Sequence, residues 1–255
     1  MEEWFSIIFP FLCVVLRTAG LFITAPVLGA RYVPVPVKAG ISLIAGYVLW
    51  PSVPVAPLPA SIPALVGPAL GEIAFGLLLG FIAGIIISAV EMAGQVADMM
   101  MGFGLSNVMD PSLGQSVPIM GTFKHLMITL MFLIMNGHHL FIKGLWDSFS
   151  LVPAGGAFIP IEWAAIGLLS FGKMLWIAVV LSCPIWASAL IVDMSLGMIA
   201  RTVPQMNVFV VGMPIKALVG LGIMSASIAF YGIFTKEITE TIGSVLGSLL
   251  GALAR

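Results

Sequence analysis

Two long stretches of this chain contain no charged side chain at all. One lies between Lys173 and Asp193, and the other lies between Lys216 and Lys236. A helix needs about 20 mostly apolar residues to cross the hydrocarbon core of a bilayer, and both stretches approach that length. Water-soluble domains rarely contain such stretches, so these two predict membrane-spanning helices.

The composition extends this conclusion to the whole chain. Only 8% of the 255 residues are charged and 60% are apolar, whereas a soluble domain carries about 25% charged residues. So few charges cannot cover the surface of a soluble protein, and so much apolar side chain excludes disorder. The net charge of -1 and the lack of a basic run disfavour a nucleic-acid partner. The chain is therefore predicted to be an all-α, polytopic integral membrane protein.

The expected helices lie in the apolar stretches 4–28, 39–50, 64–90, 117–142, 163–192, 216–234 and 237–254. Several of them are interrupted by charge, at Arg17, Glu72, Lys124 and Lys173. An ionised group at the centre of a bilayer costs about 3 kcal/mol on insertion scales. These side chains are therefore expected to face protein or water rather than lipid.

Prolines make long, regular, lipid-facing helices hard to maintain. The prolines between residues 51 and 68 exclude a regular helix there and predict an extended connector. Pro10, Pro26, Pro184 and Pro214 predict kinks or breaks inside apolar segments. Broken helices persist in a membrane only where neighbouring protein satisfies their backbone. The pattern predicts long, kinked helices surrounded by partner subunits.

Two stripes of small residues predict close helix packing. Glycine spaced every four residues lies on one helix face and lets two helix backbones approach closely. The stripes are formed by Gly76, Gly80 and Gly84, and by Gly243, Gly247 and Gly251.

Few polar residues suggest chemistry. Glu91, Gln95 and Asp98 share a helix face, which fits either a proton path in a secondary transporter or structural pairing within an assembly. His138 and His139 are adjacent, so they point to different faces, and a metal site would need further ligands. No nucleophile motif, zinc-protease motif or phosphate-binding loop is present. The sequence predicts no enzyme, no cofactor and no metal.

Methionine is concentrated near the middle of the chain. Met99, Met100 and Met101 directly precede a loop rich in glycine and polar residues, which begins at Gly102. Flexible, unbranched thioether side chains seal against varied shapes without specific contacts. This suits a gate that passes varied polypeptides better than a site that recognises one small solute.

Short motifs spread over most of the chain are typical of one family. They are Thr24-Ala25-Pro26, Val33-Pro34-Val35-Pro36-Val37-Lys38-Ala39-Gly40, Gly71-Glu72-Ile73-Ala74-Phe75-Gly76, Asp110-Pro111, Asn136-Gly137-His138-His139, Pro204-Gln205-Met206-Asn207-Val208-Phe209 and Gly212-Met213-Pro214-Ile215-Lys216. In this order, they resemble the FliR/SctT family of type III export-gate proteins.

The resemblance implies a fold and a function. Residues 1–160 would form a FliP-like helical part, and residues 161–255 a FliQ-like helical hairpin. The chain would be a core subunit of the export gate in the bacterial inner membrane, at the flagellar basal body. It would assemble with FliP-like and FliQ-like subunits, adjoin FlhB-like and FlhA-like export components, contact membrane lipid and pass unfolded flagellar polypeptides. An injectisome subunit and a proton-coupled transporter remain alternatives.

The resemblance also implies a plug. Residues 102–117 would project into the pore and close it, and Met99, Met100 and Met101 would form an apolar gasket beside them. Glycines would make this segment deformable, and Asp110-Pro111 would set one sharp turn. The residues expected to form the plug are Gly102, Gly104, Ser106, Asn107, Met109, Asp110, Pro111 and Gly114.

Overall fold

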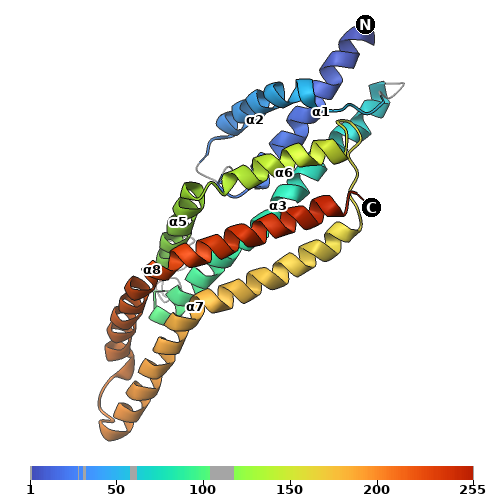
Figure 1. Ribbon diagram of the computed structural model, residues 1–255. Coiled ribbons are helices and arrows are strands. Elements are labelled where there is room, and N and C mark those ends of the chain that lie inside the picture. The colour runs from blue at the N-terminus through green and yellow to red at the C-terminus, as the bar shows by residue number, and fades with distance from the viewer. Residues whose placement is uncertain (1, 28, 31–32, 58–61, 104–117, 255) are drawn as a thin grey trace. The chain divides into compact units, whose positions relative to one another are not determined.

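The computed structural model of the chain describes residues 2–27, 29–30, 33–57, 62–103 and 118–254 (Figure 1). Within these residues, pairing of β type is limited to one isolated bridge, between Val55 and Ala154, and no strand forms. The α-helices are α1 (Glu2–Thr24), α2 (Val35–Leu49), α3 (Val66–Met101), α5 (Ile119–Ile134), α6 (His138–Leu151), α7 (Glu162–Thr202) and α8 (Val208–Gly251). The predicted all-α fold is confirmed.

Four of these helices are long and apolar enough to cross a membrane. Their qualifying segments are Ile7–Thr24, Val66–Met101, Glu162–Thr202 and Val208–Gly251. Helices α5 and α6 meet the same test only as a pair, because a break separates them. The predicted polytopic membrane protein is therefore confirmed, with four spans or five if the broken pair counts as one.

The break between α5 and α6 replaces the single helix expected over residues 117–142. Asn136 has a left-handed backbone with φ 58°, which asparagine tolerates better than most residues. Its carbonyl oxygen accepts a hydrogen bond from the His139 amide at 3.0 Å. The Asn136-Gly137 turn therefore ends one helix and starts the next.

The proline-rich connector between α2 and α3 contains little regular helix, as predicted. Only two 3₁₀ turns, Trp50–Ser52 and Ile62–Leu65, form among its described residues before α3 begins. Pro68 lies in the first turn of α3, where backbone N–H groups have no partner within the helix. Proline is tolerated there because it removes no hydrogen bond.

The two C-terminal helices are longer than a single bilayer crossing requires. At 1.5 Å per residue, each contains roughly 60 Å of helix, against a hydrocarbon core of about 30 Å. Helix α8 runs unbroken through Lys236, Glu237 and Glu240, and so joins the apolar stretches 216–234 and 237–254 in one helix. A turn at residues 203–207 joins α7 to α8, and the Asn207 side-chain oxygen accepts the amides of Phe209 (3.2 Å) and Val210 (3.3 Å).

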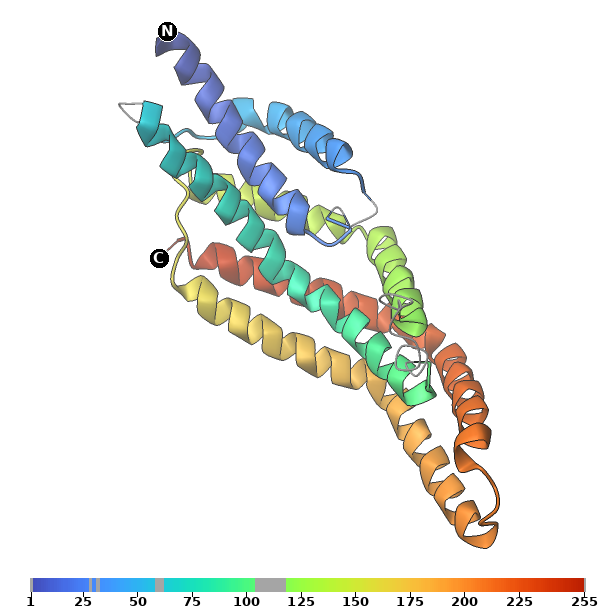
Figure 2. The ribbon, with the colours of Figure 1, turned by 180° about the vertical axis from the view of Figure 1, so that it is seen from behind.

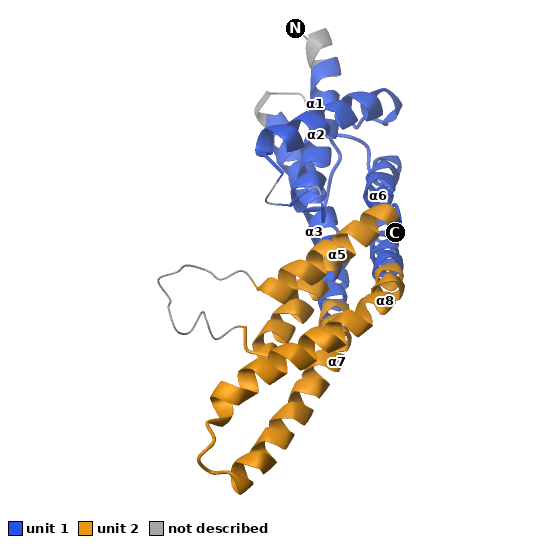
Figure 3. Cartoon of the chain, turned by 90° about the vertical axis from the view of Figure 1, so that its left-hand side faces the viewer, with its two compact units in different colours: residues 1–86, 135–172, 238–255 blue, residues 87–134, 173–237 orange. Residues whose placement is uncertain are grey.

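The chain forms two compact units, which Figure 3 shows in two colours. The first consists of Met1–Ile86, Met135–Gly172 and Ile238–Arg255, and the second of Ile87–Ile134 and Lys173–Glu237. Helices α3, α7 and α8 contribute to both. These units are defined by contacts within the chain, so the family-like division at residue 160 stays a prediction.

Candidate functional site

The C-terminal end of α3 has the hydrogen bonds of a Schellman motif. Gly102 has a φ of 86°, and its amide donates to the Met99 carbonyl at 3.3 Å. The Phe103 amide donates to the Asp98 carbonyl at 3.0 Å. Glycine suits this position because the left-handed backbone costs it no steric strain. Gly102, predicted as the first plug residue, thus ends α3.

The other predicted plug residues lie outside the described part of the chain. They are Gly104, Ser106, Asn107, Met109, Asp110, Pro111 and Gly114. The described structure resumes at Pro118, just before α5 begins at Ile119.

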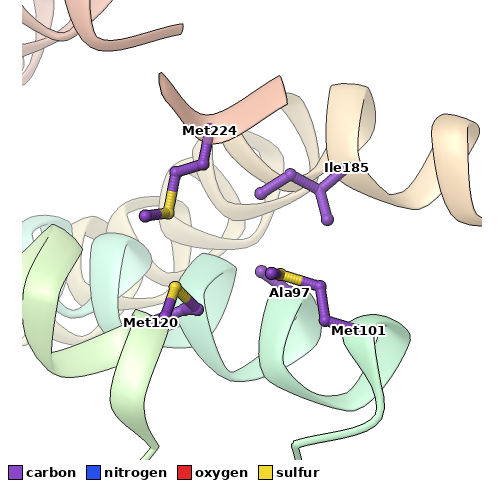
Figure 4. Close-up of a cluster of buried hydrophobic side chains, with 5 residues drawn as sticks. All are labelled: Ala97, Met101, Met120, Ile185 and Met224. Carbon is purple, nitrogen blue, oxygen red and sulfur yellow. The ribbon is translucent and has the colours of Figure 1, made fainter. Parts of the chain in front are cut away.

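The three consecutive methionines at the end of α3 have different environments. Met101 is only 2% exposed, whereas Met99 is 71% exposed. Consecutive residues on a helix point about 100° apart, so these side chains face different surroundings. Met101 packs in a buried cluster of the second unit, whose members come from α3, α5, α7 and α8: Ala97, Met101, Met120, Ile185 and Met224 (Figure 4).

Asp98 is buried and hydrogen-bonded to the start of α5. It is 4% exposed, and its two carboxylate oxygens accept the backbone amides of Met120 and Gly121, each at 3.0 Å. The first amides of a helix have no partner within that helix. Asp98 therefore acts as an N-terminal cap for α5, supplied from α3.

The three polar residues that share a face of α3 do not act together. Glu91 and Gln95 are exposed, while Asp98 is buried. A coupling carboxylate in a transporter has to bind and release a proton or cation, but both oxygens of Asp98 already accept backbone amides. This geometry favours structural pairing over a proton path.

Lys124, like Asp98, is a buried charged residue of the second unit. It is 1% exposed, and its ammonium donates to the Leu181 carbonyl of α7 at 3.5 Å. The Asp98 carboxylate is near enough to attract the Lys124 ammonium electrostatically.

Arg17 and Glu72 form a fully buried ion pair in the first unit. Arg17 Nε donates to Glu72 Oε2 at 2.6 Å, and Nη2 donates to Oε1 at 3.0 Å. Both side chains are 0% exposed. The Gly155 amide also donates to Glu72 Oε1, at 2.8 Å. The pair joins α1 to α3 and to the segment that follows α6.

Arg17 also donates hydrogen bonds to the C-terminal end of α6. Nη1 donates to the carbonyl oxygens of Ser148 (3.2 Å) and Val152 (3.0 Å). The guanidinium carbon lies 4.6 Å from the ring centroid of Phe75 and 4.2 Å from that of Phe149. Arginine tolerates such a site because its planar group combines several hydrogen bonds with stacking on rings.

The expectation that the interrupting charges avoid lipid is confirmed for three of the four. Arg17, Glu72 and Lys124 are buried within the chain itself. Lys173 is exposed, so its surroundings in an assembly stay a prediction. The sequence indicates these charges but not their partners, which lie up to 136 positions away along the chain.

The first glycine stripe lies against α1, and Figure 2 shows α3 running beside α1. A Cβ atom at Gly76 would lie 2.9 Å from the Leu21 nitrogen, and one at Gly80 would lie 2.8 Å from the Leu21 oxygen. At Gly84 the nearest atom would be the Thr24 oxygen, at 3.2 Å. This stripe therefore brings α1 and α3 into backbone contact inside the chain.

The second glycine stripe is largely open. A Cβ atom at Gly243 would lie 3.9 Å from Leu140, and no atom of the described residues lies within 4 Å of one at Gly247 or Gly251. The role of this stripe in helix packing stays a prediction.

The histidine pair supplies no metal site in the described part of the chain. The rings of His138 and His139 pack edge to face, with centroids 4.4 Å apart. Among the described residues, no group of three or more His, Cys, Asp or Glu side chains is placed to hold a metal ion.

Known proteins resemble the chain over almost all of its length. The family described as "Bacterial export proteins, family 1" matches residues 8–242. The flagellar biosynthetic protein FliR of Bacillus subtilis is 38% identical over 213 residues, which cover 82% of each chain. FliR of Escherichia coli is 28% identical over 246 residues, covering 96% of this chain and 94% of that protein.

A relative from another system matches a shorter part. The Yop proteins translocation protein T of Yersinia pestis is 32% identical over 150 residues, which cover 57% of each chain. These relatives are components of export systems and not enzymes. The family match covers far more than half of the sequence, so the chain belongs to the bacterial export proteins, family 1.

Proposed function

We propose that the chain is a core subunit of the type III export gate of flagellar biosynthesis, which forms and plugs the pore for unfolded flagellar proteins in the inner membrane. The observation that carries this proposal is the family match over residues 8–242, joined by FliR relatives that cover up to 96% of the chain. The apolar helices fit an integral membrane protein of this kind.

Exposed apolar surface supports an assembly with partners. Only 33% of the most apolar window of α7 and 17% of that of α8 are buried, against 56% for α1 and α3. Large side chains such as Trp176, Leu218 and Phe230 are 58% exposed or more. Apolar faces of this extent need cover from lipid or protein. FliP-like and FliQ-like subunits at the flagellar basal body would supply it, with FlhB-like and FlhA-like components adjoining.

Co-expression tests this assembly. Expressed alone, the chain should be degraded within minutes to hours, because α7 and α8 lack their cover. Co-expression with the FliP-like and FliQ-like subunits should lengthen its half-life several-fold, as measured by pulse-chase labelling. An unrelated polytopic membrane protein serves as the control partner. An isolated chain that is monodisperse and long-lived in mild detergent would contradict the proposal.

The hairpin proposed for residues 161–255 is supported within each unit. In the first unit, Trp163 Nε1 of α7 donates to the Leu249 carbonyl of α8 at 3.0 Å. In the second, the Lys216 ammonium lies 2.5 Å from the Asp193 carboxylate. Residues 161–255 then correspond to a FliQ-like hairpin, and residues 1–160 to a FliP-like part.

Residues 102–117 are the proposed plug, with the methionines at the end of α3 as an apolar gasket. The placement of the described flanks supports this. Helix α3 stops at Gly102, and the carboxylate of Asp98 holds the beginning of α5. The two described ends of this segment therefore lie beside a methionine-rich cluster of the second unit.

Removing the plug should open the pore. Deletion of residues 106–115 is expected to leave assembly intact, because the flanking helices are held by contacts outside the deleted part. The membrane should then leak ions and small molecules, measured as conductance of the reconstituted complex. Co-purification of the companion subunits controls for assembly. Wild-type conductance in a correctly assembled deletion variant would exclude the plug.

An injectisome export gate is the second candidate. The Yersinia translocation protein T supports it, although its match covers 57% of the chain and the FliR matches cover 82% and 96%. The longer matches favour the flagellar system.

A further inference from the structure

Asp98 joins the two helix ends that flank residues 104–117. It lies one turn before the end of α3, and its carboxylate accepts the amides of Met120 and Gly121 in the first turn of α5. We propose that Asp98 is a positioning residue of the export gate, which clamps the start of α5 to the end of α3. Its effect on the pore rests on the function proposed above, whereas the clamp itself rests on the described contacts alone.

A carboxylate fits this position for two reasons. Its two oxygens match two adjacent amides, so both donors are satisfied by one side chain. The first turn of a helix also carries a partial positive charge, which favours an anion. Hydrogen bonds to an ionised acceptor are roughly twice as strong as those between neutral groups.

Close backbone packing brings the carboxylate within reach. A Cβ atom at Gly94 would lie 2.8 Å from the Gly121 nitrogen, so no larger residue fits at position 94 without movement. Gly94 precedes Asp98 by about one turn of α3, and Gly121 carries one of the two bound amides. The glycine contact and the carboxylate thus act on the same point of α5.

Lys124 connects the clamp to a third helix. It follows Met120 by four residues and so lies on the same side of α5. Its buried ammonium donates to the Leu181 carbonyl of α7 and is attracted by Asp98. A buried charge is tolerated when it is paired and hydrogen-bonded. Loss of Asp98 would therefore leave two amides without an acceptor and Lys124 without its nearby carboxylate.

The test uses the complex assembled with its companion subunits and three variants of the chain. Asp98→Asn keeps the shape but retains only one acceptor oxygen, and Asp98→Ala removes both. Glu91→Gln is the matched control, because it removes an exposed carboxylate from the same helix. Hydrogen–deuterium exchange of residues 118–125 reports the clamp, and conductance of the reconstituted complex reports the pore.

Asp98→Asn should speed exchange of residues 118–125 about tenfold, because one charge-assisted hydrogen bond is lost. Asp98→Ala should speed it further and make the pore leak, while Glu91→Gln should match wild type in both measurements. Faster exchange together with a leak supports the proposal. If Asp98→Ala fails to assemble, Asp98→Asn carries the test, since its side chain has the same volume.

Two results would overturn the inference. Unchanged exchange in the Asp98 variants would exclude the clamp. The Asp98 variants could show faster exchange without a leak, while deletion of residues 106–115 does cause a leak. That result would exclude the positioning role of Asp98 but not the plug. If neither the deletion nor Asp98→Ala leaks, the proposed plug fails, the positioning role fails with it, and exchange alone decides whether the clamp exists.

Discussion

Glu72→Gln is expected to destabilise the folded chain by about 3–5 kcal/mol, because it leaves the Arg17 guanidinium buried without its counter-charge. The present pair is fully buried and joined by two hydrogen bonds, at 2.6 and 3.0 Å. An amide retains one acceptor for Arg17 but carries no charge. It also turns an NH₂ group toward donors that need an acceptor, including the Gly155 amide. The measurement is the unfolding midpoint of the assembled complex, together with the cellular level of the chain.

A double-mutant cycle separates the pair from the individual residues. Arg17→Met alone should be as damaging as Glu72→Gln, since it leaves the carboxylate unpaired. The double variant should lose less stability than the two single losses added together, because neither charge then remains buried alone. Glu91→Gln controls for loss of an exposed carboxylate and should change stability by less than about 0.5 kcal/mol. Additive losses in the double variant would show that Arg17 and Glu72 do not depend on each other.

Gly76→Ala is the second change with a large expected effect. The sign of its effect on stability distinguishes helix propensity from backbone packing. Alanine favours a helix over glycine by about 1 kcal/mol, so propensity alone predicts a stabilised α3. Packing predicts the opposite. The added Cβ would lie 2.9 Å from the Leu21 nitrogen and 3.0 Å from the Arg17 carbonyl carbon, and both are backbone atoms that cannot rotate away. Overpacking typically costs about 1–3 kcal/mol.

Packing should win at Gly76, because α1 would have to move away from α3 and stretch the nearby Arg17–Glu72 pair. A lower unfolding midpoint of the assembled complex is the expected result. Gly67→Ala is the matched control: it lies in the same helix, and within the described part of the chain nothing is within 4 Å of a Cβ atom there. That variant should be neutral or slightly more stable. A stabilised Gly76→Ala complex would mean that α1 and α3 do not pack this closely in the membrane.

Local sequence patterns predicted the class of this fold because they reflect local physics. Charge-free apolar stretches, such as those beginning after Lys173 and Lys216, have few stable alternatives to helices in lipid. The left-handed backbone at Gly102 and Asn136 could be predicted in part, because glycine and Asn-Gly pairs mark helix ends and turns. The spacing of Gly76, Gly80 and Gly84 indicated a close helix contact, but it carried no information about which helix would supply it.

The length of α8 could not be predicted from hydropathy. Lys236, Glu237 and Glu240 separate the apolar stretches 216–234 and 237–254 on a hydropathy scale, yet the helix continues through them. Lysine and glutamate are good helix formers. Charged residues are rare in membrane spans because their exposure to lipid is costly, and not because they interrupt a helix. Only the structure shows where such residues lie.

The sequence by itself determined an all-helical membrane protein, the positions of its unusual charges and its family. Only the tertiary structure decided how those charges are satisfied. Arg17 binds Glu72, 55 positions away, and Asp98 caps a helix that begins 21 positions later. Helix periodicity shows which residues share a face, but a salt bridge or a cap between helices depends on which faces meet. That choice is made by packing of the whole chain, where a backbone contact at glycine brings a carboxylate within reach of its donors.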